Sequence, residues 1–324
     1  MPDAGPFDSA RGTGLAQGGP RTPDAPEISL LVVNYNTRDL LLQCIESIHR
    51  HPPSRLWELI VVDDRSIDGS PEAVRERFPR ARLIVQPRNL GYACANNAGL
   101  RAARGRYVVL LNSDLELRGN TFDVLSGFMD ATPRAGAAGT TLANPDGTPQ
   151  LSCRSLPDLP VTLLHTLGVH KIWKGCPSIR NYYQVDRDYA RLDEVEMASL
   201  ACCMFRREAI DTVGLLDERY FLYVGDTDWV FRIRKEGWRI YYVPGPPVVH
   251  YGGESASLGG LFLILDFHRG MFRYYHKHLQ DRYPSWIYPL VALGVGMRML
   301  LYAARNLLGL SNRVCASDYK RVNR

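Results

Sequence analysis

Polar residues follow each of four short apolar runs in the first third of the chain. The four groups are Asn34-Tyr35-Asn36, Asp63-Asp64, Arg88-Asn89 and Asn112-Ser113-Asp114. One such group would be ordinary, because turns favour Asn and Asp. In an open α/β sheet, however, ligands bind beyond the carboxyl ends of the strands. Four polar strand ends in succession therefore predict a polar crevice that binds a ligand.

Two common phosphate-binding devices are missing from the sequence around this crevice. No Gly-x-Gly-x-x-Gly follows the first apolar run, and no Gly-x-x-x-x-Gly-Lys loop occurs in the chain. A dinucleotide site and a P-loop triphosphate site are therefore not supported. A diphosphate bound without these devices needs another source of positive charge. A divalent cation held by a carboxylate is the natural one.

The elements that must position the crevice alternate between strand and helix. Short, largely apolar runs predict strands at 28–33, 59–62, 82–86 and 107–111. Helices are predicted between them, from apolar residues at helical spacing after residue 40, from a Ser70-Pro71 start signal and from small residues at 93–104. This order predicts an α/β fold with a mostly parallel central sheet and helices on both faces.

The rhythm changes after the fourth strand. Later elements are expected as a strand at 197–205, a helix at 225–236 and a strand at 238–243. Residues 155–193 are aromatic and polar without a clear period, and we expect them to form a loop region over the site.

Composition and cysteine usage limit the class of protein and its compartment. The net charge of +5 is too mild for nucleic acid, and the basic residues do not gather in one run. The seven cysteines form no Cys-x-x-Cys pair and sit in apolar stretches, which predicts buried free thiols. Since no secretion signal is recognisable either, we expect a cytoplasmic protein.

Three segments are expected along the chain. Residues 1–26 are rich in Gly, Pro, Ala and Asp and are predicted to be a disordered tail. A catalytic domain at 27–255 and a helical extension at 256–324 follow. The apolar stretch 286–310 is interrupted by Pro289, Arg298 and Arg305, which argues against a membrane span. Two interpretations stay open: a helix in the interface of the inner membrane on its cytoplasmic face, or a helix packed on the protein's own core.

The motifs, taken in order, resemble family 2 of the nucleotide-sugar glycosyltransferases. They are Leu31-Val-Val-Asn-Tyr-Asn36, Val61-Val-Asp-Asp-Arg-Ser-Ile-Asp-Gly-Ser70, Asn89-Leu-Gly-Tyr-Ala-Cys-Ala-Asn-Asn-Ala-Gly99 and Leu110-Leu-Asn-Ser-Asp114. Two later strings are similar to the rhamnosyltransferase-like branch, Phe221-Leu-Tyr-Val-Gly-Asp-Thr-Asp-Trp229 and Val248-Val-His-Tyr-Gly-Gly253. The resemblance implies a GT-A fold and inverting, non-processive transfer of one sugar from a nucleotide diphosphate to a glycan or lipid-linked glycan. The branch suggests dTDP-rhamnose as donor.

The resemblance also implies roles for individual residues. The expected donor-binding set is Asn34, Tyr35, Asn36, Asp64, Arg88, Asn89, Gly91, Asn97 and Asn112. Within it, Asp64 matches the acid that pairs with the base of the donor. Asp114 matches the last acid of the Asp-x-Asp motif, which binds Mg²⁺ or Mn²⁺, and Asn112 replaces the first acid. His250 is implied as a further metal ligand or phosphate contact, and an imidazole ligand favours Mn²⁺.

The expected catalytic base is Asp226. By resemblance it takes the proton from the acceptor hydroxyl, within hydrogen-bond reach. The family usually has Glu directly before it, where this chain has Gly225, so Asp228 stays open as an alternative base. Gly225 and Asn112 also keep open a catalytically inactive subunit that binds sugar nucleotides or glycans.

Overall fold

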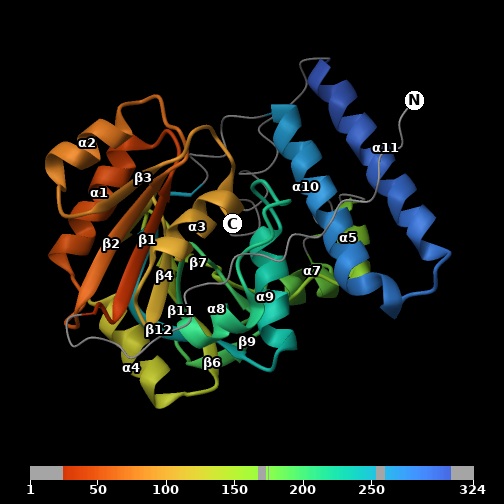
Figure 1. Ribbon diagram of the computed structural model, residues 1–324. Coiled ribbons are helices and arrows are strands. Elements are labelled where there is room, and N and C mark those ends of the chain that lie inside the picture. Colours follow the sequence, from red (N-terminus) through yellow and green to blue (C-terminus); the bar gives the residue numbers. More distant parts are fainter. Residues whose placement is uncertain (1–24, 167–172, 174, 253–259, 308–324) are drawn as a thin grey trace, which may run out of the picture.

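The computed structural model describes residues 25–166, 173, 175–252 and 260–307, and it has the expected α/β architecture (Figure 1). Four parallel strands lie in the order β3-β2-β1-β4, with helices in the connections between them. They are β1 (Ile28–Asn34), α1 (Arg38–Arg50), β2 (Trp57–Asp63), α2 (Ser70–Arg77), β3 (Arg82–Val85), α3 (Tyr92–Ala102) and β4 (Tyr107–Asn112). The tail expected at 1–26 lies almost wholly outside the described residues.

Both faces of the sheet are buried, which explains why the strands read as continuous apolar runs. Leu30, Val32 and Val61 contribute to a core cluster covered by α1, α2 and α4. Leu31 and Ile60, which point to the opposite face, pack with α3, α8 and α9. The alternation of side chains along each strand thus divides one sheet between two cores.

The second half of the chain extends the same sheet, which continues from β4 in the order β11-β6-β12-β5. The elements are β5 (Leu115–Leu117), α4 (Thr121–Ala131), β6 (Ala135–Ala143), β7 (Pro149–Gln150), β11 (Cys202–Arg206), α8 (Arg207–Val213), α9 (Gly225–Lys235) and β12 (Arg239–His250). The strand expected at 238–243 was predicted too short, since β12 continues to His250. Its ladder is interrupted between Val243 and Val248, where three prolines cannot donate a hydrogen bond, and pairing then resumes.

The stretch 155–193 is more ordered than the loop region that we expected. It contains α5 (Leu159–Thr166), α7 (Pro177–Tyr182) and β9 (Asp193–Val195), and β8 (Cys153–Arg154) pairs with β10 (Met197–Ala198). The loop prediction for this stretch was therefore wrong in part. Helices as short as α7 show too few turns for a periodic pattern to be visible in the sequence.

The C-terminal part forms a helical hairpin beside α5 (Figure 1). It consists of α10 (Gly260–Tyr274), a π-helical turn η2 (Tyr275–Leu279), a 3₁₀ turn η3 (Gln280–Arg282) and α11 (Ile287–Leu307). Among the helices of the described ranges, none combines the length and the apolar character needed to cross a bilayer. The six cysteines of the described part are free thiols, as expected, and burial raises the pKa of Cys153 and Cys202 to about 12.

Candidate active site

The register of the parallel strands brings the polar strand ends level with one another. Asn34 pairs with Asp63 across β1 and β2, and Val33 pairs with Asn112 across β1 and β4. The Asn34 side chain donates to the Asp63 carboxylate (Nδ2 to Oδ2, 2.9 Å) and accepts from the Thr37 hydroxyl (2.7 Å). Asn34 and Asp63 are fully buried. Asn34 therefore ties the strand ends together beneath the crevice, and its assignment as a donor contact is corrected to a structural role.

The turn after β1 is held by the loop after β2. Asn36 adopts a left-handed backbone (φ 51°), which Asn tolerates better than most residues. Its N–H donates to the Ser66 hydroxyl and its side-chain oxygen accepts from the N–H of Ile67, both at 2.8 Å. Tyr35, between these anchored residues, is half-buried. The turn is thus a fixed wall of the crevice.

Asp64 lies under the loop that begins α3. Its two carboxylate oxygens accept from the N–H groups of Leu90 (2.9 Å) and Gly91 (2.8 Å), and it is 3% exposed. Burial raises the pKa of Asp64 above its ordinary value, and the two N–H bonds act in the opposite direction. Each oxygen keeps a further lone pair. Asp64 can therefore accept one more hydrogen bond from a ligand in the crevice.

Gly91 brings the segment before α9 against this site. Its φ is +87°, and a Cβ at this position would lie 2.3 Å from the carbonyl oxygen of Phe221. The same carbonyl accepts from the N–H of Tyr92 at 2.6 Å. Only glycine fits such a close approach of two main chains. The start of α3 and the segment before α9 therefore form one unit.

Asp114 and His250 meet at the ends of β4 and β12. The His250 Nε2 atom lies 3.4 Å from Asp114 Oδ1 and 3.4 Å from Asn112 Nδ2. On its other side, His250 Nδ1 lies 2.7 Å from Gln150 Oε1, while the Gln150 amide nitrogen donates to Asn144. An Nδ1–H that donates to the Gln150 side-chain oxygen turns Nε2 toward the Asp114 carboxylate and the Asn112 amide.

This donor set fits a divalent cation. Asp114 Oδ1 and His250 Nε2 lie 3.4 Å apart, and both are atoms that can ligate a divalent cation. Cis ligands of an ion bound at 2.0–2.2 Å are spaced by roughly 3 Å. In the part of the chain that the structure describes, no third His, Cys, Asp or Glu joins these two ligands. Mg²⁺ is often bound by one or two protein ligands together with substrate phosphates.

The remaining members of the expected donor-binding set are placed differently. Arg88 is exposed at the crevice edge, and Asn89 accepts from the N–H of Gly91 at 3.2 Å. Asn97 is buried, donates to Leu216 and Glu218, and accepts from Leu216, each at 2.9 Å. Its amide thus anchors the loop before α9, and its assignment as a donor contact is corrected accordingly.

The two aspartates of α9 have opposite surroundings. Asp226 is partly exposed, and one carboxylate oxygen accepts from the N–H (2.7 Å) and hydroxyl (3.3 Å) of Thr227. Its negative charge, after burial, contributes to the raised pKa of the Tyr92 phenol, so it lies near the start of α3. Thr227 also contacts the sulfur of Met197 (3.8 Å), just before β11. Asp226 therefore lies on the strand-end side of the sheet.

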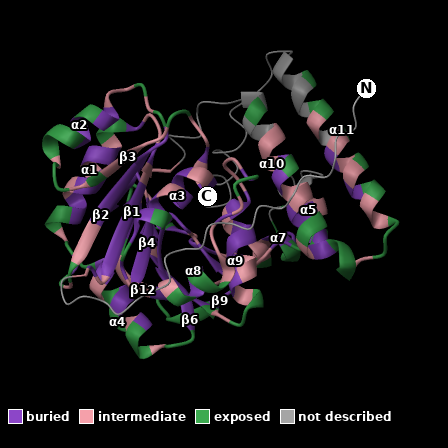
Figure 2. Cartoon of the chain, in the orientation of Figure 1, coloured by how far each residue is buried: buried purple, intermediate pink, exposed green. Residues whose placement is uncertain are grey.

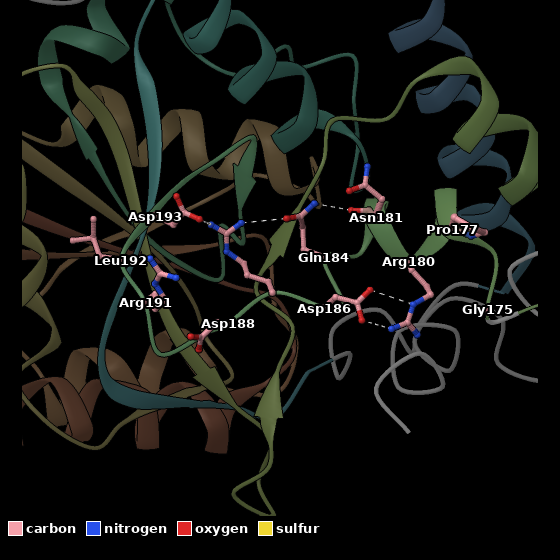
Figure 3. A pocket seen from close by; sticks show the side chains of 11 residues that line it. Gly175, Pro177, Arg180, Asn181, Gln184, Asp186, Asp188, Arg191, Leu192 and Asp193 are labelled. Atoms are coloured by element: carbon pink, nitrogen blue, oxygen red, sulfur yellow. Dashed lines mark hydrogen bonds and ion pairs between the residues drawn. The ribbon is translucent and has the colours of Figure 1, made fainter.

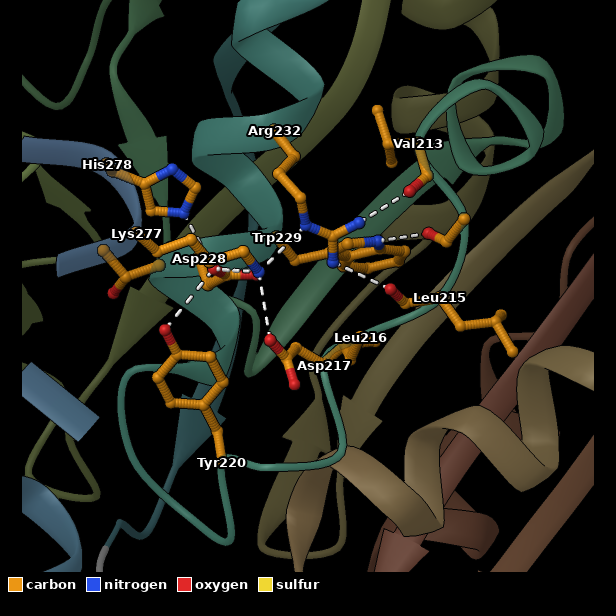
Figure 4. Close-up of polar contacts among 12 residues, drawn as sticks. Val213, Leu215, Leu216, Asp217, Tyr220, Asp228, Trp229, Arg232, Lys277 and His278 are labelled. Atoms are coloured by element: carbon orange, nitrogen blue, oxygen red, sulfur yellow. Dashed lines mark hydrogen bonds and ion pairs between the residues drawn. The ribbon is translucent and has the colours of Figure 1, made fainter. Parts of the chain in front are cut away.

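Asp228 is fully buried at the centre of an ion cluster (Figure 4). Its carboxylate lies 2.7 Å from Lys277 Nζ, 2.8 Å from His278 Nε2 and 3.0 Å from Arg232 Nε. Burial alone would raise the pKa of Asp228, but the bonds from His278 and Lys277 outweigh it and hold the pKa below its ordinary value. A carboxylate so paired has no access to an acceptor hydroxyl.

Sequence reasoning missed the residues of the C-terminal hairpin that hold the segment before α9. Asp266 on α10 accepts from the N–H groups of Leu222 (3.1 Å) and Tyr223 (3.4 Å). Val224, a β-branched residue, has φ 70°, and the absence of a side chain at Gly270 leaves room for it. No local signal marks these contacts, because their partners lie about 45 residues apart in the chain.

A separate hollow lies between α7 and the segment 184–193 (Figure 3). Arg180 is paired with Asp186, and Arg187 is paired with Asp193 at 2.8 Å. None of the expected site residues lines this hollow. This hollow is therefore separate from the site expected at the strand ends.

Comparison with known proteins defines the class to which the fold and site belong. Residues 29–214 match the model of Glycosyl transferase family 2, so the chain belongs to that family and is a glycosyltransferase with a GT-A fold. The chain is 31% identical over 239 residues to N-acetylglucosaminyl-diphospho-decaprenol L-rhamnosyltransferase of Mycobacterium tuberculosis. The aligned region covers 70% of this chain and 76% of that protein.

Two solved structures share the fold at low sequence identity. One is the mannosyltransferase PcManGT from Pyrobaculum calidifontis in complex with GDP-Man and Mn²⁺, with a TM-score of 0.53 and 19% identity over 92% of this chain and 85% of that one. The other is GalNAc-T7 with UDP, GalNAc and Mn²⁺, with a TM-score of 0.51 and 16% identity over 70% of this chain and 43% of that one.

Proposed function

We propose that this glycosyltransferase transfers one sugar, with inversion, from a nucleotide diphosphate to a hydroxyl of a glycan or lipid-linked glycan. The observation that carries the proposal is the gathering of Asp64, Asp114 with His250, and Asp226 on the strand-end side of the sheet. The named activity of the mycobacterial relative makes dTDP-rhamnose the first donor to test and a diphosphate-linked polyprenol the first acceptor. Free thiols throughout the described chain favour the cytoplasm as the compartment.

The base of the donor is proposed to bind at Asp64. A thymine or uracil ring offers one imide N–H, and the carboxylate retains lone pairs to accept it. Tyr35 and Asn36 line the turn beside it, and Arg88 and Asn89 lie on the loop above it. Because Asp64 is held by two main-chain N–H groups, its orientation is fixed before the donor arrives.

Asp114 and His250 are proposed to hold Mg²⁺ or Mn²⁺, with Asn112 beside them. A cation held by these residues would supply positive charge that stabilises the departing diphosphate. Gln150 keeps the imidazole in the tautomer with a free Nε2. The imidazole ligand favours Mn²⁺ over Mg²⁺, and the two structural neighbours described above are both complexes with Mn²⁺.

Asp226 is proposed as the general base. Thr227 occupies one oxygen, and the other is available to the acceptor hydroxyl. The acceptor oxygen bonds to the anomeric carbon as the bond from that carbon to the diphosphate oxygen breaks. The hydroxyl proton passes to Asp226, and the diphosphate leaves with the electron pair. A single displacement of this kind inverts the anomeric carbon.

The test is turnover of purified protein with dTDP-rhamnose and other sugar nucleotides, a diphosphate-linked polyprenol carrying N-acetylglucosamine, and Mn²⁺, Mg²⁺ or EDTA. We expect cation-dependent transfer, and a loss of kcat of about 10²–10⁴-fold in Asp226→Asn. Glu208→Gln is the matched control. Glu208 is an exposed acid in the first turn of α8, and Asp226 likewise lies in the first turn of α9. Because β11 runs antiparallel to β4, α8 begins at the opposite edge of the sheet from the proposed site.

The inactive binding subunit predicts another result. A sugar nucleotide would raise the melting temperature of the protein, yet no donor and acceptor pair would be turned over with either cation. Gly225 does not by itself favour this outcome. A Cβ there would lie 3.1 Å from the Cβ of Tyr220, so the segment before α9 already fills the space of a side chain.

A further inference from the structure

The exposed side of α11 carries six large apolar side chains in one row, each 52–73% exposed. We call them the α11 stripe: Trp286, Leu290, Leu293, Met297, Leu300 and Leu301. Their spacing of four and three residues places them on one helix face. At 1.5 Å per residue the row is roughly 22 Å long. Single exposed apolar residues are normal on a protein surface, but a continuous row marks an interaction surface.

The opposite side of α11 is what packs on the protein. Val291 and Val295 are buried in a cluster with Leu159 of α5 and with Tyr274 and Tyr275 of the hairpin. The hairpin is therefore held by that side, and none of the stripe residues belongs to this buried cluster. Figure 2 shows buried and exposed positions alternating along α11. The packed side of α11 agrees with one of the two interpretations that the sequence left open, a helix docked on the protein's own core.

The charge of the chain identifies the chemistry of the partner. Residues 260–324 contain ten Lys and Arg against three Asp and no Glu, whereas the other 259 residues contain 29 basic and 31 acidic residues. All of the net positive charge therefore belongs to the segment that carries the stripe. No acidic residue stands between Asp281 and Asp318. An apolar row in an acid-free, basic segment is complementary to an anionic lipid surface.

We propose that the α11 stripe docks the enzyme on an anionic lipid bilayer, with α11 lying along the surface. Trp286 at the start of the stripe suits the headgroup region, since an indole is apolar with one polar edge. The proposal rests on the proposed function in one respect, because a lipid-linked acceptor explains why the enzyme docks there. Through Asp266 and Lys277 the same hairpin contacts the segment that carries Asp226, which places the base on a body fixed to the membrane.

The test is co-sedimentation of the full-length protein with vesicles of phosphatidylcholine alone or mixed with phosphatidylglycerol, without donor, metal or detergent. We expect binding to the mixed vesicles that weakens as salt is raised. The double variant Leu293→Glu/Leu300→Glu should lose at least about ten-fold in partitioning, since burial of each leucine alone contributes more than that factor. Leu56→Glu is the matched control. Leu56 is as exposed as Leu290 of the stripe (56% for both), but it lies at the amino end of β2, away from α11.

Two outcomes would overturn the proposal. One is equal vesicle binding by wild type and the double variant, with unchanged circular dichroism for both. The other is no vesicle binding together with a wild-type dimer that the double variant converts to a monomer in light scattering, which assigns the stripe to a second copy. Sugar transfer to a water-soluble acceptor separates the two proposals, because it tests the proposed function without a bilayer.

Discussion

Replacing Asp228 by Asn should destabilise the enzyme without abolishing its chemistry. The change keeps the size of the side chain and removes one negative charge from a fully buried position. Four cationic or donating groups converge there: Arg232 from α9, Lys277 and His278 from η2, and the Tyr220 hydroxyl, which donates at 3.4 Å (Figure 4). The variant therefore loosens the C-terminal hairpin from the helix that carries Asp226.

The loss of stability in Asp228→Asn depends on which other hydrogen bonds and ion pairs each partner of Asp228 retains. Removing one member of a buried ion pair costs about 3–5 kcal/mol when the other is orphaned. Arg232, however, also donates to the carbonyls of Val213 (2.6 Å) and Leu215 (2.7 Å), and Lys277 keeps Asp217 at 3.0 Å. Lys277 is also 28% exposed, so water compensates part of its loss. We expect the free energy of unfolding to fall by about 2–3 kcal/mol, which lowers Tm by roughly 5–8 °C.

The pH dependence has a definite sign. The pKa of Asp228 in the folded protein lies below its ordinary value, so ionised Asp228 stabilises the fold at any pH above the unfolded pKa of about 4. That contribution is lost as the pH falls through the folded pKa. The Tm difference between wild type and Asp228→Asn should stay constant between about pH 8 and pH 6 and shrink below about pH 4.

The assay pairs thermal unfolding with steady-state kinetics for Asp228→Asn and Asp226→Asn. The first variant should lose stability and at most about ten-fold in kcat, while the second should lose about 10²–10⁴-fold in kcat with little change in Tm. The reverse pattern, with an unchanged Tm and abolished turnover in Asp228→Asn, would refute our assignment of the base.

Three further substitutions test other parts of the site and of the fold. Gly91→Ala should destabilise the fold by at least 1–3 kcal/mol in chemical denaturation and weaken donor binding, because φ is +87° and Phe221 blocks a Cβ. Gln150→Leu should weaken Mn²⁺ binding by about 10–100-fold in titration calorimetry, since it removes the bond that orients His250. Arg206→Met should cost roughly 3 kcal/mol in chemical denaturation, as this buried guanidinium donates to three main-chain carbonyls at the end of α4 and the start of β6.

Much of the parallel half of the fold was predictable because its signals are local. Apolar runs such as those of β1 and β4 identify strands buried on both faces, and the Asn and Asp residues that follow them mark the carboxyl ends. The same local reading failed in two places. Residues 155–193 contain helices too short to show a period, and the prolines after Val243 hid the continuation of β12 to His250.

Whether a polar side chain of the candidate site can contact a ligand depends on how many hydrogen bonds it already makes within the protein. Asn34 and Asn97 share their residue type and motif context with the proposed donor contacts, yet each is buried and its amide is engaged by the protein itself. A sequence motif marks that a polar group is required but not whether it faces the ligand or the scaffold. That distinction needs the geometry of the partners.

The distinction between Asp226 and Asp228 shows why the rest of the site required the structure. Two residues apart on α9, they have the same chemistry and the same favourable position near a helix N-terminus. What separates them comes largely from Lys277 and His278, about 50 residues further along the chain, which bond to the buried Asp228, whereas Asp226 is partly exposed and bonds only locally to Thr227. Under the proposed assignment of Asp226 as the base, the helical extension takes part in the site, because its Lys277 and His278 engage the other of the two carboxylates.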